Sequence, residues 1–277
     1  IADNCCDLPE DILKQYNIKL VHALVRFGDY EYPPGKPSIA DFYEIMKSSS
    51  IMPTTSQPSP EEMKEVFTSS LEDGSEVIAI HMSSGISGTY QGSVLVKDLI
   101  DNPRLHLVDS KKASLGMGLL VLEAAKMANR GEQAGAILSR LADMQNRLQC
   151  IFFVGNLEYL IKGGRISRAK GLVAGILDIK PILRFDTDGY IVAYEKVRGH
   201  KAALHRLMEI TEKMGVNLTQ QTMGVVHSAC TDDAEYLRKA LEDKFSPSEI
   251  IMSEIGPVVG SHVGPGSFSV FFESDHL

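Results

Sequence analysis

The sequence is poor in cysteine and lacks any long run of basic or apolar residues. Its four cysteines, in 277 residues, form no C-x-x-C pair and have no zinc-ligand spacing. We therefore expect a protein of the reducing cytoplasm. No basic run of five or more residues occurs and the net charge is −8, which argues against nucleic acid as a partner. The longest apolar stretches, such as GLLVLEAAKMA, are broken by charge well short of the ~20 residues that a membrane span needs.

Sequence signatures of cofactor chemistry are also missing. Neither G-x-x-x-x-G-K-[ST] nor G-x-G-x-x-G followed by an acidic residue at nucleotide spacing occurs, and the eight histidines match no metal motif. We expect no metal and no nucleotide cofactor. No signal peptide is visible, although the chain opens at Ile1 without an initiator Met, and we expect Ile1–Asp3 to be the end of a first strand.

The first half of the chain alternates strand-like runs with helical patterns. Strand, loop and helix repeat at a spacing that predicts a parallel sheet covered by helices, a three-layer α/β/α domain over residues 1–153. The expected strands and helices include EVIAIHM (76–82), TYQGSVLVKDLI (89–100), RLHLVDS (104–110), LGMGLLVLEAAKMANRG (115–131), EQAGAILSRLADMQNRL (132–148) and CIFFV (150–154).

The second half has a different pattern. Asp188-Gly189 between two apolar runs predicts a β-hairpin. A helix, a strand, a second helix and a second strand follow, and this order predicts a two-layer α+β domain over residues 154–277. Those four elements are KAALHRLMEITEKMG (201–215), TMGVVHS (222–228), DDAEYLRKALEDKF (232–245) and EIIMSEIG (249–256).

Four loops rich in Gly, Ser, Thr and Pro are candidates for a functional site: TTSQP (54–58), SSGISGTYQ (83–91), KGGRIS (162–167) and GPVVGSHVGPG (256–266). The second follows a strand and opens a helix. Unpaired backbone N–H groups at a helix N-terminus suit an anion, Gly85 and Gly88 allow close approach, and Ser87 or Thr89 can donate a hydrogen bond. The same hydroxyls alternatively only cap the helix. Likewise Thr55 can simply stabilise a local turn.

A serine hydrolase is a second hypothesis, with Ser87 as nucleophile, His262 as base and Asp109 as the orienting acid. The nucleophile elbow requires G-x-S-x-G, but the run here is Gly85-Ile86-Ser87-Gly88-Thr89, whose second glycine comes one position early. A third hypothesis is a regulator that binds a sugar or phosphometabolite in these loops.

Taken together, these segments resemble the DegV family of bacterial fatty-acid-binding proteins. Seven motifs occur in family order over nearly the whole chain: D-x-x-x-D-L-P (3–9), MPTTSQPS (52–59), SSGISGTYQ (83–91), LEYLIKGGRIS (157–167), KPILRF-x-x-DG (180–189), K-x-RG-x-KA (196–202) and IGPVVGSHVGPG (255–266).

The resemblance implies a two-lobed α/β protein with a long-chain fatty acid, about C14–C18, buried between the lobes. It places Thr55, Ser87, Gly88 and His262 at the carboxylate, with Arg165 nearby. It also implies that the protein is not an enzyme. A separate dihydroxyacetone-kinase-like fatty acid kinase, docked through Arg198, would phosphorylate the bound acid for phospholipid synthesis.

Two segments depart from the family pattern. Asn4-Cys5-Cys6 replaces the usual Ser and Thr or Ala after the first aspartate, and SFSVFFESDHL replaces the usual ending with small residues and glycine. We expect the first to change the pocket mouth and the second to reshape the cavity floor.

Overall fold

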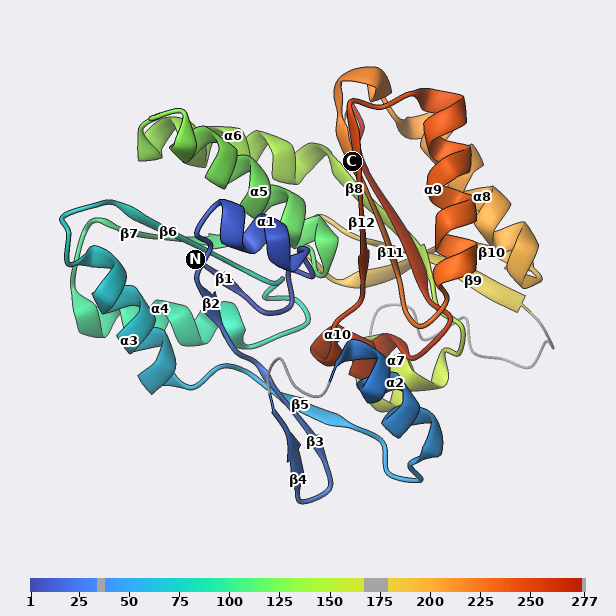
Figure 1. The fold of residues 1–277 in the computed structure, drawn as a ribbon, viewed down its shortest axis with the longest axis horizontal. Helices are drawn as coiled ribbons and strands as arrows, with labels where there is room; N and C mark the ends of the chain where they lie inside the picture. Colours follow the sequence, from blue (N-terminus) through green and yellow to red (C-terminus); the bar gives the residue numbers. More distant parts are fainter. Residues whose placement is uncertain (34–37, 167–178, 276–277) are drawn as a thin grey trace.

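The computed structural model describes residues 1–33, 38–166 and 179–275. Ser167, the last residue of the KGGRIS segment, lies outside the described residues. Two larger β-sheets form two lobes that lie side by side, and a small third sheet lies below them in Figure 1. No helix in these three ranges is long and apolar enough to cross a membrane.

The first sheet is parallel, as the alternating pattern predicted. Helices α3 and α4 pack on one face, while α5, with α6 against it, packs on the other (Figure 1). In pairing order the strands are β2 (Leu20–Val21), β1 (Ala2–Asp3), β6 (Val77–His81) and β7 (Leu105–Asp109), and the helices of this lobe are α1 (Glu10–Gln15), α3 (Pro60–Leu71), α4 (Thr89–Ile100), α5 (Leu115–Asn129) and α6 (Ala134–Arg147).

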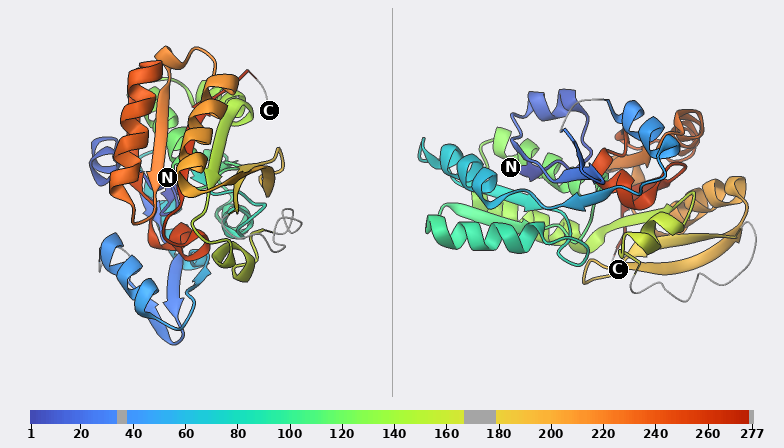
Figure 2. Two further views of the ribbon diagram at one scale, coloured as in Figure 1. Left: turned by 90° about the vertical axis from the view of Figure 1, so that its right-hand side faces the viewer. Right: turned by 90° about the horizontal axis from the view of Figure 1, so that it is seen from below.

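The second sheet is mixed. Helices α8 and α9 cover one face, and α5 reaches β8 and β11 on the other, so α5 is packed against both sheets. In pairing order the strands are β10 (Ile191–Arg198), β9 (Ile179–Phe185), β8 (Leu148–Phe153), β13 (Phe268–Glu273), β11 (Thr222–His227) and β12 (Glu249–Glu254), and the helices are α8 (His200–Met214), η2 (Leu218–Gln220) and α9 (Thr231–Phe245). Figure 2 shows α8 and α9 packed on one face of this sheet.

The strand β8 corrects one prediction. The CIFFV run was expected in the first, parallel sheet, but β8 pairs antiparallel with β13 and β9 in the second. All six of its residues are buried, and a continuous apolar run indicates a buried strand without indicating its sheet. A domain boundary at residue 153 stays a prediction, and the place of β8 favours one before Leu148.

The hairpin prediction is confirmed. The strands β9 and β10 are antiparallel and joined at Asp188-Gly189. Gly189 has φ +82°, a conformation that glycine adopts at low cost. The turn lies against the loop after β6, where Ser83 Oγ donates to the Gly189 carbonyl oxygen at 2.8 Å.

Two segments expected as loops are regular structure. TTSQP contains β5 (Thr54–Ser56), which pairs with β3 (Leu24–Phe27) in a sheet completed by β4 (Tyr30–Tyr32). GPVVGSHVGPG contains α10 (Pro257–Val263), whose first residue is a proline, a residue suited to that position. Helices α2 (Ile39–Ser48) and α7 (Glu158–Lys162) both contact α10.

Candidate functional site

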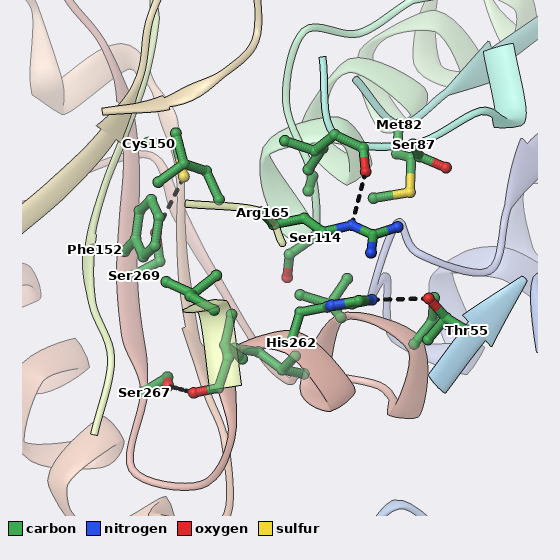
Figure 3. A pocket seen from close by; sticks show the side chains of 18 of the residues that line it. Thr55, Met82, Ser87, Ser114, Cys150, Phe152, Arg165, His262, Ser267 and Ser269 are labelled. Carbon is green, nitrogen blue, oxygen red and sulfur yellow. Dashed lines mark hydrogen bonds between the residues drawn. The ribbon is translucent and has the colours of Figure 1, made fainter. Parts of the chain in front are cut away.

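A mainly apolar cavity of about 240 Å³ lies between the two lobes. One wall comes from the six-stranded sheet and the other from the loops after β6 and β7, with β5 and α10 at one end (Figure 3). Its apolar lining includes Ala23, Met82, Ile86, Ala113, Phe152, Leu160, Phe185, Ile191, Val226, Ile255, Val258, Val259, Val263, Phe268 and Phe271. Most of the polar side chains in its lining are hydroxyls, which suits a ligand with a long apolar part and a small polar group.

Thr55 and His262 meet at one end of this cavity. The Thr55 Oγ1 and His262 Nε2 atoms are 2.8 Å apart (Figure 3). The pairing of β5 with β3 places Thr55, and α10 packs on both strands and carries His262. The two residues that the family resemblance assigned to a carboxylate are therefore in direct contact.

This pair keeps one proton available for a ligand. A neutral imidazole has one N–H and threonine has one O–H, and their mutual hydrogen bond uses one of the two. His262 Nδ1 is buried without a hydrogen-bond partner among the described residues and lies against Gly163, where a Cβ atom would collide with it. The arrangement favours an Nε2–H that donates to Thr55, so that the Thr55 hydroxyl can donate into the cavity.

His262 is neutral at neutral pH. Burial, together with the nearby charge of Arg165, lowers the pKa of His262 to about 4. A neutral imidazole adds no charge to the site, so the attraction for an anion must come from donated hydrogen bonds and from Arg165.

Ser87 lies between β6 and α4, at the junction that the sequence indicated. Its Oγ accepts a hydrogen bond from the Thr89 N–H at 3.2 Å and lies 2.9 Å from Thr89 Oγ1. The hydroxyl thus accepts the N–H of the first residue of α4, whose N-cap is Gly88, and it also lines the cavity. When Thr89 Oγ1 donates to it, its own proton is available to a ligand, so this local hydrogen bond and ligand binding are compatible.

Gly88 and Arg165 complete this end of the site. A Cβ atom at Gly88 would collide with the side-chain oxygen of Gln57, so the absence of a side chain at Gly88 lets Gln57 pack closely there. Arg165 donates to the carbonyl oxygens of Ile86 at 3.1 Å and Gly163 at 2.6 Å. It forms no ion pair with an acidic residue among those the structure describes, and burial lowers its pKa. Its positive charge is therefore available to an anion.

A surface depression adjoins the cavity. Ser87, Gly88 and Arg165 line both the apolar cavity and this depression, whose other lining residues include Gln91 and Leu95 of α4. A polar group held by Ser87 would therefore lie close to this depression.

The opposite wall is built from β8 and β13. Phe152 and Phe271 face the cavity together with Cys150 and Ser269, whose Sγ and Oγ atoms are 3.5 Å apart. Burial raises the pKa of Cys150 to about 12, so it remains a neutral thiol.

The two departures from the family pattern differ in their effect. Asn4 exchanges hydrogen bonds with Ala23, which lines the cavity, while Cys5 and Cys6 are buried outside the lining. None of the three lines the cavity, so an effect on the pocket mouth stays a prediction. The C-terminal departure lines the cavity directly, through Ser267, Phe268, Ser269 and Phe271.

Arg198, which the resemblance assigned to kinase docking and not to the ligand, lies outside the cavity lining, and one lining residue was not predicted. Arg198 is exposed at the end of β10 and does not line the cavity. Ser114 lines it and was missed. It lies at the junction between β7 and α5, equivalent to the position of Ser87 between β6 and α4, and this repeated strand-to-helix junction was a usable signal.

The geometry does not assemble the hydrolase triad. Ser87 bonds to Thr89 and His262 to Thr55, so no hydrogen bond joins the two. Asp109 accepts hydrogen bonds from the Ser84 and Lys111 N–H groups and is also paired with the Lys111 ammonium. In the three described ranges, no group of three or more His, Cys, Asp or Glu side chains could hold a metal ion.

The family follows from comparison with known proteins. The sequence profile described as "Uncharacterised protein, DegV family" matches residues 1–275. The chain belongs to the DegV family. A DegV domain-containing protein of Caldanaerobacter subterraneus is 36% identical over 277 residues, which cover 99% of this chain and 97% of that protein.

Solved structures of fatty-acid-binding DegV proteins share the fold. One from Thermus thermophilus, described by its fatty acid binding, has a TM-score of 0.92 and 28% identity and covers 99% of this DegV protein and 98% of its own chain. DegV of Bacillus subtilis, a fatty acid binding protein, has a TM-score of 0.89 and 28% identity, with coverages of 99% and 98%. A stearic-acid-binding protein of Eubacterium ventriosum shares the fold at 23% identity, a TM-score of 0.85 and coverages of 98% and 96%.

Proposed function

We propose that this DegV protein binds a long-chain fatty acid in the cavity between its lobes. The observation that carries the proposal is an apolar cavity with the Thr55–His262 pair and Ser87 at one end. The fatty acid binding of the related proteins at 28% identity supports it.

Apolar burial supplies most of the binding energy in this proposal. Each buried methylene contributes roughly 0.8 kcal/mol, so a chain of about C14–C18 gives a gross stabilisation of about 10–14 kcal/mol before the cost of association. A hydrogen bond to the charged carboxylate adds about 1.5–3 kcal/mol. The apolar lining therefore determines affinity and chain preference, and Thr55, Ser87, Arg165 and His262 determine which end of the acid reaches the depression.

The protein itself is proposed to be a carrier, and a separate fatty acid kinase is proposed to convert the bound acid to an acyl phosphate for phospholipid synthesis. Two features support this division. The sequence contains no nucleotide-binding motif, and Ser87 and Arg165 line both the cavity and the open depression where a partner can reach the carboxylate. The exposed Arg198 is proposed to contact that kinase.

Native mass spectrometry of protein purified from a bacterial host tests the proposal. We expect one bound acid per chain that extracts into organic solvent and whose mass identifies a C14–C18 fatty acid. A Phe152→Asp variant, with a charge in the apolar wall, serves as a cavity-blocked control and should carry none. Repeated preparations without any lipid would contradict the proposal, and a ligand that partitions into water would favour the phosphometabolite regulator instead.

A further inference from the structure

The peptide unit between Ile255 and Gly256 is held from both sides by side chains from the first 43 residues. The Tyr43 hydroxyl donates to the Ile255 carbonyl oxygen at 2.8 Å, and the Gly256 N–H donates to Asp7 Oδ1 at 2.9 Å. The C=O and N–H of a planar trans peptide point in opposite directions. This peptide therefore cannot rotate without breaking one of the two hydrogen bonds.

Both bonds lie in an environment where their loss is costly. Tyr43 is 1% exposed and Ile255 is 4% exposed. A buried carbonyl that loses its only side-chain donor is left unsatisfied, which costs more than an average hydrogen bond contributes. Asp7 is fixed in turn by Ser114, whose Oγ donates to Asp7 Oδ2 at 2.5 Å.

Asp7 and Ser114 also have unusual backbone conformations. Their φ angles are +47° and +53°, in the region that non-glycine residues rarely adopt. Such conformations persist where the surrounding contacts enforce them, and they are frequent at functional sites. Ser114 lines the cavity, so the network begins at the cavity wall and ends at the Ile255–Gly256 peptide.

This peptide leads directly into α10, which carries His262. The Gly256 carbonyl oxygen accepts the first helical hydrogen bond, from the Gly260 N–H at 2.8 Å. Since α10 has only seven residues, the orientation of the entering peptide sets where its last turn lies. Tyr43 contacts the helix a second time at Gly260, where a Cβ atom would lie 2.6 Å from the hydroxyl oxygen.

We infer that Asp7 and Tyr43 are positioning residues, which hold His262 against Thr55 through the Ile255–Gly256 peptide and so set how firmly the ligand is retained. The inference rests on the proposed fatty acid site, because retention is measured with that ligand. Neither side chain lines the cavity, so Tyr43 acts through α10, and Asp7 acts through α10 and through Ser114.

The test combines a spectroscopic signal with ligand release. In Tyr43→Phe and Asp7→Ala, we expect the ¹⁵N resonances of the His262 ring to shift in the lipid-free protein. We also expect release of a fluorescent fatty acid to accelerate about tenfold, as the loss of one buried hydrogen bond allows. Tyr194→Phe is the matched control, because its hydroxyl contacts Met214 Sδ at 3.9 Å in the other core. It should change neither signal.

A double-mutant cycle separates positioning from general destabilisation. In a Thr55→Val background the Tyr43→Phe change should accelerate release little further, because the contact that it positions is already lost. A full additional effect in that background, or unchanged His262 resonances in both variants, would overturn the inference. If Asp7→Ala does not fold, Tyr43→Phe alone decides. If no preparation binds fatty acid, the proposed function fails, whereas the His262 resonances still test the positioning.

Discussion

The imidazole of His262 lies 2.8 Å from the hydroxyl of Thr55, although 207 residues separate them in the chain. The contact joins α10 to β5 at one end of an apolar cavity. With the Nε2–H tautomer that this environment favours, the contact leaves the Thr55 proton available to a ligand.

Loss of the Thr55 hydroxyl should weaken fatty acid binding more than a change in the shape of this side chain. Thr55→Val keeps the volume but removes the donor, and we expect fatty acid affinity to fall by about 1.5–3 kcal/mol, or roughly 10- to 150-fold. Thr55→Ser keeps the hydroxyl and should lose much less. Titration with a fluorescent fatty acid measures both. Equal losses in the two variants would show that the methyl group, and not the hydroxyl, is required.

Gly163 should tolerate no side chain. Its Cβ atom would collide with His262 Nδ1 and would lie 2.9 Å from the Tyr159 carbonyl oxygen, so we expect Gly163→Ala to lower the free energy of unfolding by about 1–3 kcal/mol. Gly135→Ala is the control, because nothing lies within 4 Å of that position on α6, and alanine should be neutral or stabilising by up to ~1 kcal/mol there. Urea denaturation compares them, and similar values for both variants would contradict the predicted collision.

His262 should make the lipid-free protein less stable in acid. Its pKa falls from 6.5 to about 4 on folding, so the unfolded chain binds more protons between these values and stability is lost as the pH falls from about 6.5 to 4. Asp7 acts in the opposite direction, since burial raises its pKa to about 7 and stability is lost as the pH rises from about 4 to 7. Comparing wild type with His262→Gln cancels the Asp7 contribution.

As the pH falls from about 6.5 to 4, the free energy of unfolding of wild type minus that of His262→Gln should decrease by up to about 3 kcal/mol. Urea denaturation at several pH values measures the difference. A difference that stays constant with pH would show that the imidazole is not held neutral.

Ser87 should act in presentation and not as a nucleophile. We expect Ser87→Ala to reduce phosphorylation of the bound acid by a fatty acid kinase more than it reduces lipid affinity, because apolar burial supplies most of that affinity. A fluorophosphonate probe should leave Ser87 unlabelled. Stoichiometric labelling would instead support the serine hydrolase.

Most local elements were predictable because their signals are local. The parallel strands β6 and β7, the hairpin at Asp188-Gly189 and the junction at Ser87 all follow from periodicity and turn residues within about ten positions. The family motifs likewise named Thr55, Ser87, Arg165 and His262, all four of which line the cavity.

The sequence by itself determined the alternation of strands and helices and the candidate polar residues. Only the tertiary structure decided that β8 joins the second sheet, that the segment of His262 is a helix, and that Asp7 and Tyr43 hold the peptide before it. The physical reason is the distance along the chain over which each kind of signal acts. Periodicity records which face of an element is buried, whereas pairing across 207 or 249 residues depends on how separate elements pack, and no local pattern encodes it.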